Sequence, residues 1–196
     1  MSDCPRVDEP KLLPHRIAGN LALDLANTFS FRGTACEVDH LAGIDDVQGW
    51  AAAAGLVDDG WSVPPTESRS FLATVHRLRI AVDVAGAAIA DHAEPPADAL
   101  ATIRDIAAGS LARATLVGAP AHLSFTGTDR IIGPIAWAAL DLLRGPELDR
   151  LKQCPSNDCQ WLFIDRTKNG SRRWCEMATC GDKAKRRTRK AATSRG

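Results

Sequence analysis

The sequence lacks the motifs by which many enzymes and membrane proteins are identified. Its 196 residues contain no Walker loop, no Gly-x-Gly-x-x-Gly segment and no His-Glu-x-x-His segment, and the five histidines are scattered without metal-ligand spacing. No apolar run is long enough for a transmembrane helix, and the first twenty residues contain no apolar core of a signal peptide. We therefore expect a cytoplasmic protein that is not an enzyme and has no membrane partner.

The chain also has no net charge, because 24 basic residues balance 24 acidic ones. Taken alone, this balance argues against a nucleic-acid-binding protein. The charges are nevertheless divided along the chain: residues 1–149 carry 11 basic and 20 acidic side chains, and residues 150–196 carry 13 basic and 4 acidic ones. The sequence therefore predicts an acidic body of charge −9 joined to a basic C-terminal module of charge +9.

Apolar periodicity predicts a mainly helical body. Apolar residues make up 45% of the chain and charged residues 24%, which is typical of a soluble globular protein. Prolines in residues 1–18 predict an extended lead-in, and residues 19–150 are expected to form a helical domain with its own core. The expected elements are a central helix with an apolar stripe over residues 71–89, shorter helices at 21–29, 45–54, 100–109 and 131–143, and a small β-hairpin within 112–125.

Four of the six cysteines lie in two pairs near the C-terminal end of the chain. Four residues separate Cys154 from Cys159 and Cys175 from Cys180, and fifteen residues lie between the pairs. Two such pairs can supply the tetrahedral thiolate set that zinc accepts. In a reducing compartment all six cysteines are expected to be thiols or metal ligands rather than disulfides. The spacing predicts a zinc site, and the alternative is four structural thiols without a metal.

The sequence around these cysteines predicts a treble-clef-like Cys4 zinc finger over residues 151–196. Residues 161–164 have a strand pattern, 165–170 are rich in turn residues and 171–174 return toward the second pair, so a β-hairpin is expected between the pairs. Strong helix formers without proline follow Cys180 and predict a basic helix. Because so small a module buries little apolar area, zinc is expected to supply most of its folding free energy.

Both parts of the chain resemble a known family. Residues of the finger look like the bacterial CGNR zinc finger. The run that carries the resemblance is Leu142-Leu143, Leu151, Cys154-Pro155, Asp158-Cys159, Trp161-Leu162-Phe163-Ile164-Asp165, Arg172-Arg173-Trp174-Cys175, Met177 and Cys180-Gly181. Residues 19–28 are similar to the opening of the ABATE domain that precedes this finger. The resemblance implies a stress-induced transcription regulator with a DNA-binding finger and an all-helical regulatory body. The sequence Cys-Gly-Asp-Lys at residues 180–183 departs from the family's Cys-Gly-Asn-Arg in its last two positions.

Basic residues of the finger are candidate DNA contacts. Lys183, Arg186, Arg187 and Lys190 would form one stripe on the predicted helix, and a helix that carries arginines can enter a major groove. The alternative is a solvated basic tail that keeps the protein soluble or binds its acidic body. The full candidate set is Arg166, Lys168, Arg172, Arg173, Lys183, Lys185, Arg186, Arg187, Arg189 and Lys190.

The sequence leaves three functions open. The first is a zinc-dependent DNA-binding regulator whose body senses a signal, such as a small-molecule effector, or mediates homo-oligomerisation. Asn27 and Thr28, at the end of the first helix, are candidates for a ligand pocket, although such pairs more often cap or end helices. The second is a protein- or RNA-interaction module without sequence-specific DNA binding, and the third is a redox switch in which thiolate oxidation ejects zinc. Basic charge serves DNA and RNA alike, but no aromatic-rich RNA signature is present.

Overall fold

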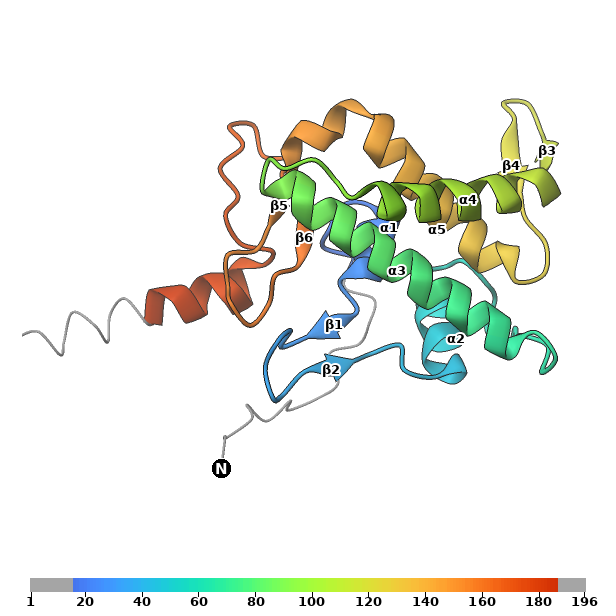
Figure 1. Ribbon diagram of the computed structural model, residues 1–196, viewed down its shortest axis with the longest axis horizontal. Coiled ribbons are helices and arrows are strands. Elements are labelled where there is room, and N and C mark those ends of the chain that lie inside the picture. Colours follow the sequence, from blue (N-terminus) through green and yellow to red (C-terminus); the bar gives the residue numbers. More distant parts are fainter. Residues whose placement is uncertain (1–15, 187–196) are drawn as a thin grey trace, which may run out of the picture.

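The computed structural model describes residues 16–186 as a mainly helical protein with three two-stranded sheets, which confirms the predicted fold class (Figure 1). The helices are α1 (Leu21–Ala26), α2 (Ile44–Ala53), α3 (Ser68–Ala90), α4 (Ala97–Arg113), α5 (Asp129–Arg144), the 3-10 helix η1 (Pro146–Arg150) and the π-helical turn η2 (Met177–Gly181). The antiparallel strand pairs are β1 (Phe29–Ser30) with β2 (Val38–Asp39), β3 (Thr115–Val117) with β4 (His122–Ser124), and β5 (Leu151–Gln153) with β6 (Leu162–Ile164). Most of the predicted lead-in and the candidate DNA contacts Arg187, Arg189 and Lys190 lie outside the described residues.

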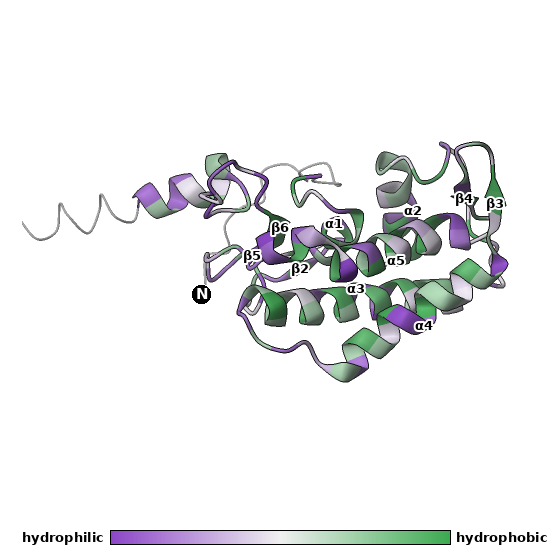
Figure 2. Cartoon of the chain, turned by 90° about the horizontal axis from the view of Figure 1, so that it is seen from above, coloured by the Kyte–Doolittle hydropathy of each residue, from purple (hydrophilic) through white to green (hydrophobic). Residues whose placement is uncertain are grey.

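Helix α3 is the central helix, as its apolar stripe predicts. Phe71, Val75, Leu78, Val82 and Ala85 are all buried along one side of it. Helices α1, α4 and α5 pack against α3, and Figure 2 shows α3, α4 and α5 side by side. Within residues 16–186, no helix has both the length and the apolar character needed to cross a membrane.

Two helices end at places that the apolar pattern does not predict. Helix α4 continues past Gly109 to Arg113, because contacts beyond the glycine hold its last turn. There the Arg113 guanidinium donates to Asp129 at the start of α5, with Nε and Oδ2 2.6 Å apart, and the buried Ser110 hydroxyl donates to the same carboxylate. Helix α1 stops at Ala26, before the predicted end, and the chain turns into β1.

The β-hairpin of the finger differs from the predicted one. Strand β6 pairs with β5, so that Leu151 lies opposite Ile164 and Gln153 opposite Leu162, whereas residues 171–174 form no strand. The prediction of a hairpin between the two cysteine pairs is therefore wrong. The observed pairing is favoured because it turns Leu151, Leu162 and Ile164 into the apolar core, where all three are almost completely buried.

The finger hairpin and the helical body share one core. Leu151, Leu162 and Ile164 belong to the same buried cluster as the apolar residues of α1, α3 and α5. The approach is close: a Cβ atom added at Gly86 of α3 would lie 2.5 Å from Cδ1 of Leu162, so this position has no room for a side chain. The packing is thus continuous across residue 150. This continuity argues against the expectation that the body folds independently of the finger.

Replacing Leu162 by Ala is expected to lower the free energy of unfolding by about 3 kcal/mol, because a fully buried side chain would leave a cavity between β6 and α3. The matched control is Leu116→Ala on β3, where the leucine is 70% exposed and truncation is expected to cost almost nothing. Denaturant unfolding of both variants in excess zinc measures the difference. Equal costs at the two positions would contradict the shared core.

Candidate metal centre

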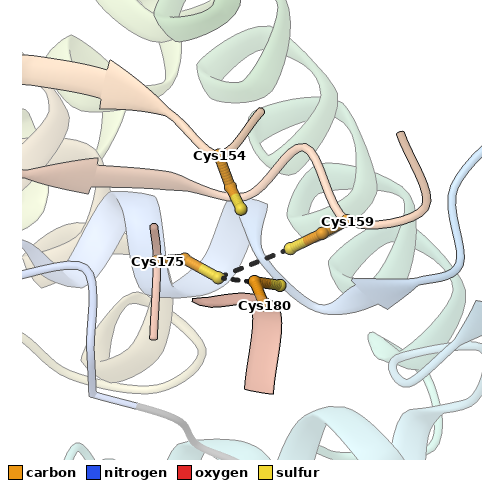
Figure 3. Close-up of side chains that lie close together, drawn as sticks. All are labelled: Cys154, Cys159, Cys175 and Cys180. Atoms are coloured by element: carbon orange, nitrogen blue, oxygen red, sulfur yellow. Dashed lines mark hydrogen bonds between the residues drawn. The ribbon is translucent and has the colours of Figure 1, made fainter. Parts of the chain in front are cut away.

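The structure brings the four paired cysteines together at one point. Their sulfur atoms all lie within 4.8 Å of one another, and Figure 3 shows them converging from two segments of the chain. Sγ of Cys159 lies 3.5 Å from Sγ of Cys175, which lies 3.7 Å from Sγ of Cys180. In a tetrahedral site with Zn–S bonds of about 2.3 Å, neighbouring sulfurs are about 3.8 Å apart. The residues present therefore fit a tetrahedral metal ion such as zinc.

The first cysteine pair lies in the turn that connects β5 to β6. The Cys154 amide donates to the Trp161 carbonyl at 2.8 Å, which continues the strand pairing by one step. The Cys159 amide donates to the Ser156 carbonyl at 2.9 Å, and Gln160 then reverses the chain in a left-handed conformation with φ of 59°. Strand pairing thus fixes Cys154, and a tight turn returns Cys159 to the same side.

The second cysteine pair is shaped by the close packing of η2. The Gly181 amide donates to the Glu176 carbonyl at 3.2 Å, so the segment that contains Cys180 folds back toward Cys175. A Cβ atom at Gly181 would lie 2.5 Å from Sδ of Met177 and 3.3 Å from Cδ1 of Trp174. A larger residue next to Cys180 would displace the Met177 side chain, so the absence of a Cβ atom at Gly181 allows Met177 and Trp174 to pack against the backbone there.

Arg172 attaches the second pair to the rest of the molecule. Its guanidinium donates to four carbonyl groups and lies 4.4 Å from the ring centroid of Phe163. The accepting carbonyls are those of Ile17, Ile164, Trp174 and Cys175. Arg172, which the sequence offers as a candidate DNA contact, is therefore occupied in holding Cys175 against β6 and residue 17.

Lys152 and Asp165 hold the loop between the two pairs, and the sequence patterns did not identify them. Lys152 Nζ donates to Asp165 Oδ2 and to the Gly170 carbonyl, both at 2.6 Å. Burial alone would raise the pKa of Asp165, but hydrogen bonds from Lys152 and Thr167 outweigh it and hold this pKa well below its usual range. The sequence signals for Asp165 are its place after a strand-like run, which a surface turn would also show, and its place in the run 161–165 that carries the family resemblance; neither assigns it a partner.

Without a metal, the four sulfurs compete for protons. Hydrogen bonding from Cys159 lowers the pKa of Cys154, whereas hydrogen bonding with Cys154 raises the pKa of Cys175. All four thiols cannot ionise together at this distance unless a cation balances their charge. Binding of a divalent metal would supply that charge and release the remaining protons.

One cysteine departs from the expectation that all six are thiols or metal ligands. Cys36, in the segment between β1 and β2, is disulfide-bonded. That expectation is therefore wrong at this position, whereas the four cysteines of the metal centre are free of disulfides.

Several of the predicted DNA contacts are engaged within the protein. Arg166 forms a bidentate pair with Glu147, with its Nε 2.6 Å from Oε1, and this hydrogen bond lowers the pKa of Glu147. Lys183 donates to Asp158 at 3.3 Å and lies 5.5 Å from the ring centroid of Phe31. These two side chains and Arg172 thus help to position the finger.

Other predicted contacts lie at the surface of the finger. Lys168, Arg173 and Arg186 are exposed, as is Lys185, whose Nζ lies 3.8 Å from Oδ1 of Asp182. These four side chains are accessible to a partner.

The two residues that depart from the family's Asn-Arg form local ion pairs. Asp182 pairs with Lys185, and Lys183 pairs with Asp158.

Asn27 contacts the finger, whereas the hydrogen bonds of Thr28 lie within the body. The Asn27 amide donates to the Leu162 carbonyl and accepts from the Leu162 amide, both at 2.8 Å. Thr28 is completely buried, and its hydroxyl donates to the Leu25 carbonyl at 2.7 Å. Asn27 is the C-cap residue of α1, which agrees with the alternative that the pair ends a helix.

The fold and the site together define a helical protein with a C-terminal four-cysteine finger. Residues 19–146 match the ABATE family model, described as "Putative stress-induced transcription regulator", and residues 150–192 match the CGNR zinc finger model. The chain belongs to the ABATE family and carries the CGNR zinc finger, so the resemblance seen in the sequence is confirmed. A search of the curated proteins finds no match.

Replacing Arg172 by Lys is expected to weaken metal binding by about tenfold or more, because lysine cannot reach several carbonyls with one planar group. The matched control is Arg173→Lys, since Arg173 is exposed and is expected to be neutral in this measurement. Competition with a chromophoric chelator gives the affinity of each variant. Equal affinities for the two variants would show that Arg172 does not hold the second cysteine pair.

Proposed function

We propose that this protein is a zinc-dependent, DNA-binding transcription regulator. Its finger contacts DNA, and its helical body senses a signal or mediates oligomerisation. The observation that carries the proposal is the concentration of exposed basic side chains on the same finger that forms the four-cysteine site, in a chain whose body is acidic. The family description, which names a transcription regulator, supports it.

Zinc is the metal that the donor set favours. Four thiolates form a soft, tetrahedral site, which suits zinc better than calcium or magnesium. When bound, the ion would hold the two cysteine pairs against each other. Residues of the chain position the cysteines: β6 positions the first pair, and Arg172 positions the second.

The set of side chains that we assign to DNA contacts is smaller than the ten candidates predicted from the sequence. Arg166, Arg172 and Lys183 are engaged in contacts that hold the finger, so we assign the phosphate contacts to side chains at the surface. Among the described residues these are Lys168, Arg173, Lys185 and Arg186, whereas Arg166 and Lys183, although exposed, are paired with Glu147 and Asp158.

The contact between body and finger offers a route for regulation. The Asn27 amide bonds both backbone polar atoms of Leu162, and the Ile164 amide donates to the Ala18 carbonyl at 2.8 Å. The Trp161 indole donates to the Phe29 carbonyl at 2.6 Å. A shift of α1 or β1 that follows a signal would therefore move β6 and the cysteine pair attached to it.

Purified under reducing conditions, the chain is expected to contain about one zinc ion per molecule. Removing it is expected to loosen residues 171–186 and to leave β6 in place, because the hydrogen bonds and core contacts of β6 do not pass through the metal. Hydrogen exchange before and after chelation checks this. The Gly181 amide should lose protection and the Leu162 amide should keep it. Absence of any metal in the reduced protein would remove the zinc proposal.

Binding to duplex DNA is expected to weaken steeply with salt. If about six basic groups contact phosphates, the slope of log Kobs against log salt is roughly −5. Replacing Lys168, Arg173 and Arg186 together by Ala should reduce the magnitude of the slope by about 3, because each phosphate contact releases about one counterion. Fluorescence anisotropy with a labelled duplex at several salt concentrations gives both slopes.

The matched control for this triple variant removes the same charge from the body. Arg69, Arg77 and Arg104 are exposed on α3 and α4, and their replacement by Ala should leave the salt slope unchanged. If both triple variants weaken binding equally, the effect is one of net charge and the finger is not the DNA-binding surface. Binding of transcripts but not of duplex DNA would favour the RNA-interaction alternative.

A further inference from the structure

A concave surface lies on the finger beside the second cysteine pair. It encloses about 440 Å³ and is lined by Ser171, Arg172, Arg173, Trp174 and Met177; we name it the Trp174–Met177 pocket. Trp174 and Met177 form its apolar wall, and the Arg173 guanidinium lies 5.9 Å from a ring centroid of Trp174. The pocket therefore combines an apolar wall with a cation on a basic module.

Met177 presents apolar surface on the finger. Its side chain is 51% exposed. Its sulfur lies over Gly181, where an added Cβ atom would be 2.5 Å from Sδ of Met177 and 3.3 Å from Cδ1 of Trp174, so both side chains lie against the same glycine. The apolar surface of Met177 and Trp174 is therefore exposed beside the Arg173 guanidinium.

We propose that the Trp174–Met177 pocket receives the 5-methyl group of a thymine in the major groove of DNA. The inference rests on the proposed DNA binding and adds what the finger reads there. The thymine methyl is the apolar group that a base edge presents in the major groove. Phosphates flank it on both sides, which suits Arg173 and the net charge of +9 on residues 150–196. An apolar protein partner would gain nothing from that charge.

The pocket gives the finger a means to distinguish DNA from RNA. Uracil lacks the methyl group, so an RNA strand would leave the apolar wall of Trp174 and Met177 in contact with water. Basic charge alone cannot make this distinction, because both nucleic acids carry the same phosphates. The methyl contact would therefore add chemical selectivity to an interaction that is otherwise dominated by charge.

The test compares two duplexes that differ only in this methyl group. Full-length, zinc-loaded protein is titrated against an alternating dA–dT duplex and an alternating dA–dU duplex at the same salt concentration. A methyl group removed from water corresponds to about a fourfold gain in affinity, so the dU duplex is expected to bind about four times more weakly. Met177→Gln, which has a similar length but is polar, should abolish the difference, and Met177→Leu should keep it.

The matched control is Leu116→Gln, because Leu116 is exposed on the β3–β4 hairpin, at the opposite end of the molecule from the finger (Figures 1 and 2). This variant should keep the full preference for the dT duplex. Equal affinity of the unaltered protein for the two duplexes, or a preference that survives Met177→Gln, overturns the methyl pocket and leaves the proposed function standing. If the unaltered protein binds neither duplex, both proposals fall. The comparison on the unaltered protein does not depend on the folding of any variant.

Discussion

The position of strand β6 determines how the finger is oriented on the body. Leu162 fills the space opened by Gly86 on α3, and both of its backbone polar groups are bonded by the side chain of Asn27. Buried backbone groups must be hydrogen-bonded, and a strand at the edge of a two-stranded sheet leaves half of them without partners. Asn27 supplies the missing donor and acceptor together. The Asn27 amide thus makes the two hydrogen bonds that a neighbouring strand would otherwise make, and β6 can be buried in an otherwise helical core.

This arrangement changes the expected role of the metal. A finger that folds alone would depend on zinc for most of its stability, which is what the small size of the module predicts. Here Leu151, Leu162 and Ile164 are removed from water by contact with the body. A bound metal would then serve chiefly to join the second cysteine pair to the first. Conversely, removal of the hairpin would leave a gap in the core of the body. Each part therefore contributes to the stability of the other.

The helical elements and the four-cysteine cluster could be predicted because each leaves a local pattern. The stripe on α3 repeats over more than five turns, and the cysteine pairs have equal spacing. Strand β5 has only three residues, too few for an alternating pattern, so its pairing with β6 could not be read from the sequence. Arg172 and Arg173 are adjacent and chemically identical, yet one bonds four carbonyls and the other is exposed. Only the tertiary structure separates them.

The contact between Asn27 and Leu162 has a chemical consequence beyond its geometry. An amide offers one donor and one acceptor, and the Leu162 backbone requires one of each. Hydrolysis of the Asn27 side chain to a carboxylate would keep the volume nearly constant but would place an anionic oxygen against the Leu162 carbonyl. The two oxygens would repel each other in a buried site, at a position that is 2% exposed. Asparagine is a thermolabile residue, and the folded core keeps water from this one. The joint between body and finger therefore depends on a neutral side chain at residue 27 that both donates and accepts a hydrogen bond.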